Sequence, residues 1–194
     1  MNGKRILIVG GVAGGASCAA RARRMDENAE ITIFERGSFV SFANCGLPYH
    51  IGGVIPSEDG LVVISPEALS QRFNIGVRLQ SEVIAIDRAK REIEVRELLT
   101  ARVYREQYDA LVLAPGAAPL RPPLPGIDLP GIFTLRSIPD SRNIIDWIER
   151  RKASSAVIVG GGFIGLEMAE NLVRRGINVT VVEMLNQVLP MVFP

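Results

Sequence analysis

A short apolar run, Lys4–Val9, stands near the start of the chain and ends at a cluster of glycines. A run of this length bounded by glycine is typical of a buried parallel strand. The next segment, Gly14–Met25, is rich in Ala and Arg and predicts a helix. In Glu30–Glu35 polar and apolar residues alternate and several are β-branched, which predicts a second strand. Strand, glycine turn, helix and strand together predict a βαβ unit.

The same pattern returns near the end of the printed sequence. A second succession of strand, helix and strand is predicted at Ser154–Val159, Gly162–Arg175 and Asn178–Glu183. A shift of 150 residues superposes Val9-Gly10 on Val159-Gly160. The chain therefore contains two units of the same kind.

The hydrophobic pattern predicts further elements between these units. The Ser-Pro-Glu sequence at 65–67 predicts a helix start, with serine as N-cap and proline in the first turn. Alternating apolar segments in Val77–Val103 predict an antiparallel meander, and Tyr108–Ala114 predicts another buried strand. Residues 119–131 hold five prolines and two glycines, which predicts an irregular connection between domains. Ser137–Lys152 predicts a helix.

These elements predict an α/β fold of two Rossmann-like, three-layer nucleotide-binding domains, residues 1–118 and residues 119–194. A doubly wound domain needs more strands than one βαβ unit supplies. We therefore expect the second domain to be interrupted by the chain end, and the sequence to be the N-terminal part of a longer protein.

The composition argues against several functions. With 22 basic and 21 acidic residues the net charge is +1, which gives no reason to expect binding to nucleic acid or to a membrane surface. No apolar run reaches the roughly 18 residues that a membrane span needs. Cys18 and Cys45 form no disulfide framework, so we expect a reducing cytoplasm. The single His50 gives no basis for a histidine metal site.

The first glycine-rich loop has the properties of a pyrophosphate site. Gly10 permits a tight turn and Gly15 permits close packing of helix on strand, although Val12 stands where G-x-G-x-x-G has its second glycine. Glu35 follows Gly15 by 20 residues, at the end of the next strand. A carboxylate there accepts hydrogen bonds from ribose hydroxyls, so the loop predicts a dinucleotide site.

The second loop matches the pattern in full. Gly160, Gly162 and Gly165 fall between a predicted strand and a predicted helix, and Glu183 closes the next strand. An acidic residue at that position favours NAD over NADP, although the following loop could supply cations, so both cofactors stay open.

Cys45 is the candidate redox residue. Pro48 fits a first helical turn after it, and a helix N-terminus stabilises a thiolate. Ser41 and Asn44 could hydrogen-bond a neighbouring ligand, whereas Cys18 lies mid-helix among alanines and is expected in the core. No C-x-x-C pattern is present, so redox chemistry would use one protein sulfur and an external partner.

Two segments then resemble the flavoprotein pyridine nucleotide–disulfide oxidoreductases, and the resemblance extends over essentially the whole chain. Residues 41–53, Ser-Phe-Ala-Asn-Cys-Gly-Leu-Pro-Tyr-His-Ile-Gly-Gly, are very like the motif of the coenzyme A disulfide reductases. Residues 108–117 resemble the second flavin-domain motif of the family. The resemblance is to the single-cysteine branch, which contains coenzyme A disulfide reductases, persulfide or polysulfide reductases and NADH oxidases.

The resemblance implies that the first loop binds FAD and the second binds NADH or NADPH, and that electrons pass through the flavin to Cys45. Cys45 would then reduce a small disulfide or persulfide of the coenzyme A kind, in a parent protein that is a homodimer. In an oxidase the same sulfur would cycle through a sulfenic acid. Two further possibilities stay open, namely a fragment that binds nucleotide without turnover and a dehydrogenase that uses only the second loop.

The resemblance also assigns residues. Coenzyme A would contact Ser17, Arg21, Arg24, Ser41 and Asn44; Arg21 and Arg24 share a helix face suited to phosphate, or form a solvated basic face. Ala13 stands where peroxidase relatives carry histidine, and Phe73 stands near a substrate-binding lysine of some coenzyme A disulfide reductases. The candidate cofactor-binding residues are Gly10, Gly11, Val12, Ala13, Gly14, Gly15, Glu35, Arg36, Asn44, Val83, Ala114, Pro115, Gly116, Gly160, Gly161, Gly162, Phe163, Ile164, Gly165 and Glu183.

Overall fold

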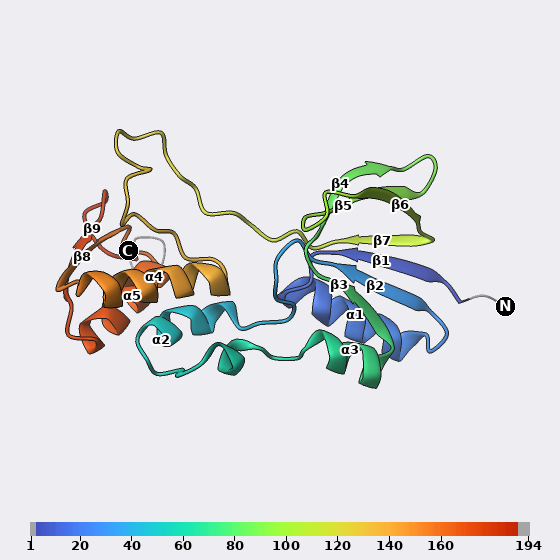
Figure 1. Ribbon diagram of the computed structural model, residues 1–194, viewed down its shortest axis with the longest axis horizontal. Helices are drawn as coiled ribbons and strands as arrows, with labels where there is room; N and C mark the ends of the chain where they lie inside the picture. Colours follow the sequence, from blue (N-terminus) through green and yellow to red (C-terminus); the bar gives the residue numbers. More distant parts are fainter. Residues whose placement is uncertain (1–2, 190–194) are drawn as a thin grey trace. The chain divides into compact units, whose positions relative to one another are not determined.

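A computed structural model describes residues 3–189 (Figure 1). The chain forms two compact units. The first contains residues up to 42 and residues 62–117, and the second contains residues 43–61 and residues from 118 onward. Residues 43–61, which lie within the predicted first domain in sequence, therefore pack with the second unit.

The first unit is built on a parallel sheet in the order β3-β2-β1-β7. Its strands are β1 (Arg5–Val9), β2 (Glu30–Phe34), β3 (Ile75–Arg78) and β7 (Ala110–Leu113). The crossover from β1 to β2 is α1 (Ala13–Met25). The predicted βαβ unit is thus confirmed.

Three layers make up this unit. On one face of the sheet, α1 and α3 (Pro66–Phe73) cover a core that includes Ile8, Ile33 and Leu69 (Figure 1). On the other face lies the antiparallel meander of β4 (Ser81–Asp87), β5 (Glu92–Glu97) and β6 (Val103–Gln107). Burial of apolar side chains on both faces explains why the parallel strands are continuously apolar.

Two sequence predictions in this unit need correction. Val77 does not begin the meander, because Ile75–Arg78 pairs in parallel with β2 and the meander starts only at Ser81. The strand predicted to be buried at Tyr108–Ala114 is half-buried, with Leu113 59% exposed, because β7 lies at the edge of the sheet. The helix start at Ser65 is confirmed: its hydroxyl accepts the N–H of Ala68 at 3.2 Å.

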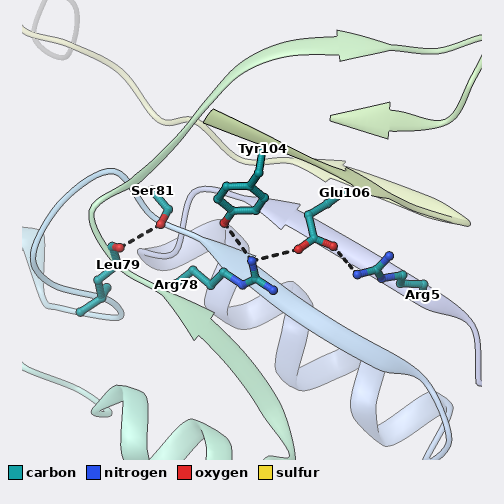
Figure 2. Close-up of polar contacts among 6 residues, drawn as sticks. All are labelled: Arg5, Arg78, Leu79, Ser81, Tyr104 and Glu106. Carbon is teal, nitrogen blue, oxygen red and sulfur yellow. Dashed lines mark hydrogen bonds and ion pairs between the residues drawn. The ribbon is translucent and has the colours of Figure 1, made fainter. Parts of the chain in front are cut away.

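A charged network joins the meander to the parallel sheet. Figure 2 shows the carboxylate of Glu106 between Arg5 and Arg78, at 2.9 Å from the Arg78 guanidinium. Arg78 also donates to the Tyr104 hydroxyl at 2.9 Å and lies over the Phe34 ring. The Glu106 side chain is only 13% exposed, so this pairing fixes β6 on β1 and β3.

The second unit contains the second βαβ motif. Its strands β8 (Ser155–Val159) and β9 (Asn178–Val182) pair in parallel, with α5 (Phe163–Arg174) between them in sequence. The described residues form no third strand on this sheet, and Val159 is 85% exposed. Residues 119–131 contain neither helix nor strand, as their composition predicts.

Helices from residues 43–61 and from the C-terminal segment of the chain complete the second unit. The predicted helix at 137–152 is α4 (Ile138–Arg151), which begins with a capping box between Ser137 and Asp140. Residues 43–61 form the 3₁₀ turns η1 (Asn44–Gly46) and η2 (Glu58–Leu61) and the short helix α2 (Leu47–Ile51). The core residues are Ile51, Ile144, Leu172 and Ile177.

Candidate functional site

The first loop requires glycine at two positions. Gly10 has φ +93°, and a Cβ there would lie 2.0 Å from the carbonyl oxygen of Ala114. A Cβ on Gly15 would lie 1.7 Å from the carbonyl oxygen of Gly10. The turn and the helix–strand approach expected of these residues are therefore present.

Glu35 fastens this loop to the end of β2. Its Oε2 accepts the backbone N–H of Gly11 at 2.7 Å, and its Oε1 accepts the N–H of Gly37 at 2.7 Å. The residue is only 9% exposed. Each carboxylate oxygen has a second lone pair, so these bonds leave acceptor capacity for a ribose hydroxyl.

The second loop repeats this construction. Gly160 has φ +108°, and a Cβ on Gly165 would lie 2.0 Å from the Gly160 carbonyl oxygen. Glu183 accepts the N–H of Gly161 at 2.7 Å and that of Leu185 at 3.0 Å. Backbone hydrogen bonds lower the pKa of Glu183, because they stabilise the carboxylate; the bond from Leu185 has the larger effect and that from Gly161 follows.

The repeat continues past each glutamate. Six residues after Glu35, Ser41 donates its N–H to the Gly11 carbonyl at 2.8 Å; six residues after Glu183, Leu189 donates to the Gly161 carbonyl at 3.0 Å. Both donor residues have a left-handed backbone conformation, with φ +47° at Ser41 and +50° at Leu189. The sequence repeat does not reveal this equivalence, because serine and leucine share no side-chain chemistry.

Both helix N-termini can accept a phosphate group. Neither α1 nor α5 has a side-chain hydrogen bond at its N-cap, so the first-turn N–H groups have no side-chain acceptor. A Cβ on Gly162 would meet nothing within 4 Å, which means that open space faces this residue. The residues of both loops thus fit a bound dinucleotide.

The remaining candidate cofactor residues lie in different surroundings. Ala114 donates its N–H to Val9 at 2.8 Å and lies beside the first loop, while Gly116 has φ +70°. Arg36 is exposed on the loop after β2. Val83 packs into the cluster between sheet and meander. The candidate residues that are exposed in the two loops and after β7 are Ala13, Gly14, Pro115, Gly116, Gly162, Phe163 and Ile164.

Cys45 is exposed in the turn η1, which runs directly into α2. Pro48 lies in the first turn of α2, as predicted. Gly46 is buried, and a Cβ there would lie 2.7 Å from a Leu61 methyl group. Asn44 donates to the Arg136 carbonyl at 3.4 Å. Ser41 belongs to the first unit and Cys45 to the second, so their joint role stays a prediction.

The candidate substrate residues Ser17, Arg21 and Arg24 are all exposed on α1, where their i, i+4, i+7 spacing gives them one face. Arg23 differs from its neighbours. It donates to the carbonyls of Phe73, Asn74, Glu27 and Asp26, and thereby joins the C-terminal ends of α1 and α3.

Arg23 is a structural residue that the sequence pattern did not distinguish from Arg21 and Arg24.

Phe73 packs against the core of the first unit. Cys18 is only partly buried in α1, less than a core position predicts.

Within residues 3–189 no group of three or more His, Cys, Asp or Glu could hold a metal ion. In the same range no helix is long and apolar enough to cross a bilayer.

Residues 4–194 match the family described as pyridine nucleotide-disulphide oxidoreductase. The chain belongs to this family. The coenzyme A disulfide reductase of Staphylococcus haemolyticus is 41% identical over 179 residues, which are 92% of this chain but 40% of the relative. The chain therefore spans about 40% of the length of the curated relatives that it matches.

Two solved structures show the same fold. Reduced CoADR-RHD of Bacillus anthracis gives a TM-score of 0.95 at 50% identity, covering 98% of this chain and 34% of the other. A NAD-dependent persulfide reductase from A. fulgidus gives 0.91 at 37% identity, covering 96% and 34%. The Rossmann-like α/β fold predicted from the two glycine loops is thus confirmed.

Proposed function

We propose that this chain is the nucleotide-binding part of an FAD-dependent oxidoreductase that reduces a disulfide or persulfide of the coenzyme A class with NAD(P)H, through Cys45. The observation that carries the proposal is the pair of similarly built loops, each held by a glutamate at an uncapped helix N-terminus. Two such loops argue against a dehydrogenase with only one nucleotide.

The first loop would hold FAD and the second NAD(P)H. FAD, when bound, would take an electron pair from reduced nicotinamide and deliver it to sulfur. Gly10 and Gly15 would let the backbone approach the pyrophosphate, the N-terminus of α1 would face its charge, and Glu35 would accept from ribose hydroxyls.

Glu183 favours NADH over NADPH. At neutral pH it is a carboxylate, which would accept from a ribose diol and repel a 2′-phosphate. Residues 184–189 contain no Lys or Arg that could compensate this charge.

Cys45 would act as the nucleophile. Its thiolate attacks one sulfur of the substrate R–S–S–R, so that a Cys45–S–S–R bond forms and R–S⁻ leaves. An electron pair from NAD(P)H then breaks the new bond, which returns the Cys45 thiolate and releases a second R–S⁻. Each released thiolate takes a proton from solvent. With a persulfide, the group released in the second half is hydrosulfide.

The exposed face of Ser17, Arg21 and Arg24 supports a phosphate-bearing substrate such as a coenzyme A derivative. The parent protein would be a homodimer in a reducing cytoplasm, where Cys45 stays reduced.

The test is NADH oxidation by the purified protein with coenzyme A disulfide, with a persulfide and with oxygen, for the wild type and for Cys45→Ser. The proposal expects disulfide- or persulfide-dependent turnover that Cys45→Ser lowers about 10³-fold or more. Cys18→Ser is the matched control and should retain turnover. Full disulfide turnover by Cys45→Ser would refute the proposal. NADH consumption matched by oxygen uptake and indifferent to disulfides would instead establish the oxidase, and a protein that binds nucleotide without any turnover would establish a nucleotide-binding fragment.

A further inference from the structure

The helix that follows Cys45 is tied to the C-terminal end of α5. Arg175, the C-cap of α5, donates Nη1 to the carbonyl of Ile51 at 3.1 Å and Nη2 to the carboxylate of Glu149 at 2.9 Å. Ile51 is the last residue of α2, and Glu149 lies in the last turns of α4. The Arg175 side chain, which is 23% exposed, therefore joins three helices.

Close packing supports the same attachment. Gly52, the C-cap of α2, lies so near α5 that a Cβ there would fall 2.2 Å from Oδ1 of Asn171. Asn171 is fully buried, and its Oδ1 has no hydrogen-bond partner. Ile51 is also fully buried, in one cluster with Leu172. The end of α2 can therefore move relative to α5 only by breaking this packing.

The two ends of α5 contact different functional parts. Its N-terminus follows Gly162 of the second glycine loop, and its other end carries Arg175. The twelve residues between them span about 18 Å. The other end of α2 follows directly after η1, the turn that contains Cys45. A rigid path of hydrogen bonds and packed side chains thus runs from the nucleotide loop to the cysteine turn.

We propose that Arg175 is a positioning residue for Cys45, which couples nucleotide occupancy at the N-terminus of α5 to the reactivity of the Cys45 thiol. Occupancy of this loop by a nucleotide rests on the function proposed above, whereas the attachment of α2 to α5 by Arg175 does not. A nucleotide that stiffens α5 restricts α2 through Arg175, and therefore narrows the conformations in which Cys45 meets a reagent.

The experiment measures the rate of Cys45 alkylation by iodoacetamide, followed by mass spectrometry of the Cys45 peptide so that Cys18 does not interfere. The probe is ADP-ribose, which carries no reducing equivalent, at a saturating concentration set by calorimetry. In the wild type we expect ADP-ribose to slow alkylation about 5-fold or more. In Arg175→Ala the two rates should become equal within about 1.5-fold, whereas Arg175→Lys should keep part of the response.

Arg174→Ala is the matched control. Arg174 is exposed on the same helix and should keep the wild-type response, and circular dichroism should show that all variants fold. If Arg175→Ala keeps the full slowing, ADP-ribose acts on Cys45 directly and the proposal is overturned.

The nucleotide-free rate separates this inference from the proposed function. Without any nucleotide, Arg175→Ala should alkylate about 3-fold faster than Arg174→Ala, because the end of α2 opens more often. Absence of ADP-ribose binding in calorimetry would count against the proposed function, whereas equal nucleotide-free rates in these two variants would count against the role of Arg175.

Discussion

The carboxylate of Glu35 accepts the backbone N–H of Gly11 at 2.7 Å, across the gap between the end of β2 and the first glycine loop. The same bond joins Glu183 to Gly161 in the second unit. The acidic residue that a dinucleotide fingerprint assigns to ribose thus also fixes the glycine loop that we propose binds the pyrophosphate. In each unit the proposed ligand contact and the loop geometry therefore depend on the same side chain.

Glu35→Gln should therefore weaken the fold as well as the flavin site. An amide has only one acceptor oxygen, so one of the N–H groups of Gly11 and Gly37 would face an NH₂ group in a site that is 9% exposed. We expect a loss of about 1–3 kcal/mol in the free energy of unfolding, measured by urea denaturation, with weaker FAD retention. Glu30→Gln, at an exposed strand position, is the control and should change neither. An unchanged Glu35→Gln protein would contradict the anchoring role.

The substitutions Gly162→Ala and Gly165→Ala should distinguish an effect on nucleotide binding from an effect on folding. Gly162 is extended and faces open space, so alanine fits the apoprotein but occupies the place of the pyrophosphate. We expect an unchanged melting temperature and a KM for NADH at least about 10-fold higher. A Cβ at Gly165 would lie 2.0 Å from the Gly160 carbonyl, so Gly165→Ala should lower the melting temperature itself. The prediction fails if Gly162→Ala binds NADH as the wild type does.

Glu183→Ala should shift the preference between the two nicotinamide cofactors. Removal of the carboxylate removes both the ribose acceptor and the charge that repels a 2′-phosphate. We expect the ratio of kcat/KM for NADPH to kcat/KM for NADH to rise about 10-fold or more. Because Glu183 also holds Gly161, both values should fall, and the ratio is the informative quantity. Glu170→Ala, exposed on α5, should leave the ratio unchanged.

The ion pair between Glu58 and Arg142 should make part of the stability pH-dependent. Arg142 holds both carboxylate oxygens, at 2.7 and 2.6 Å, and this hydrogen bonding lowers the pKa of Glu58 below 4.5. A carboxyl whose pKa is lower in the folded state stabilises the fold fully above about pH 4.5 and loses this contribution as the pH falls through the folded pKa. The melting temperatures of the wild type and Glu58→Gln should therefore differ most near neutral pH and converge in acid. A difference that stays constant with pH would contradict this assignment.

Much of the fold could be predicted from local pattern. The strand, glycine turn and helix of each repeat are recognisable because glycine, apolar runs and helix formers each act within a few residues. The capped starts of α3 and α4 follow for the same reason, since Ser65 and Ser137 bond within their own first turns. The short strand Ile75–Arg78 was missed, because four residues carry too little pattern to show which strand they pair with.

The sequence by itself determined two glycine loops with an acidic residue after each, one cysteine before a short helix, and membership of a family of redox enzymes. Only the tertiary structure decided that Glu35 and Glu183 hold their loops by backbone hydrogen bonds, that Ser41 and Leu189 are equivalent, and that Arg175 joins α2 to α5. These relations link residues up to 124 positions apart. They depend on where packing brings backbone carbonyls and N–H groups together, and that placement leaves no periodic trace in the order of side chains.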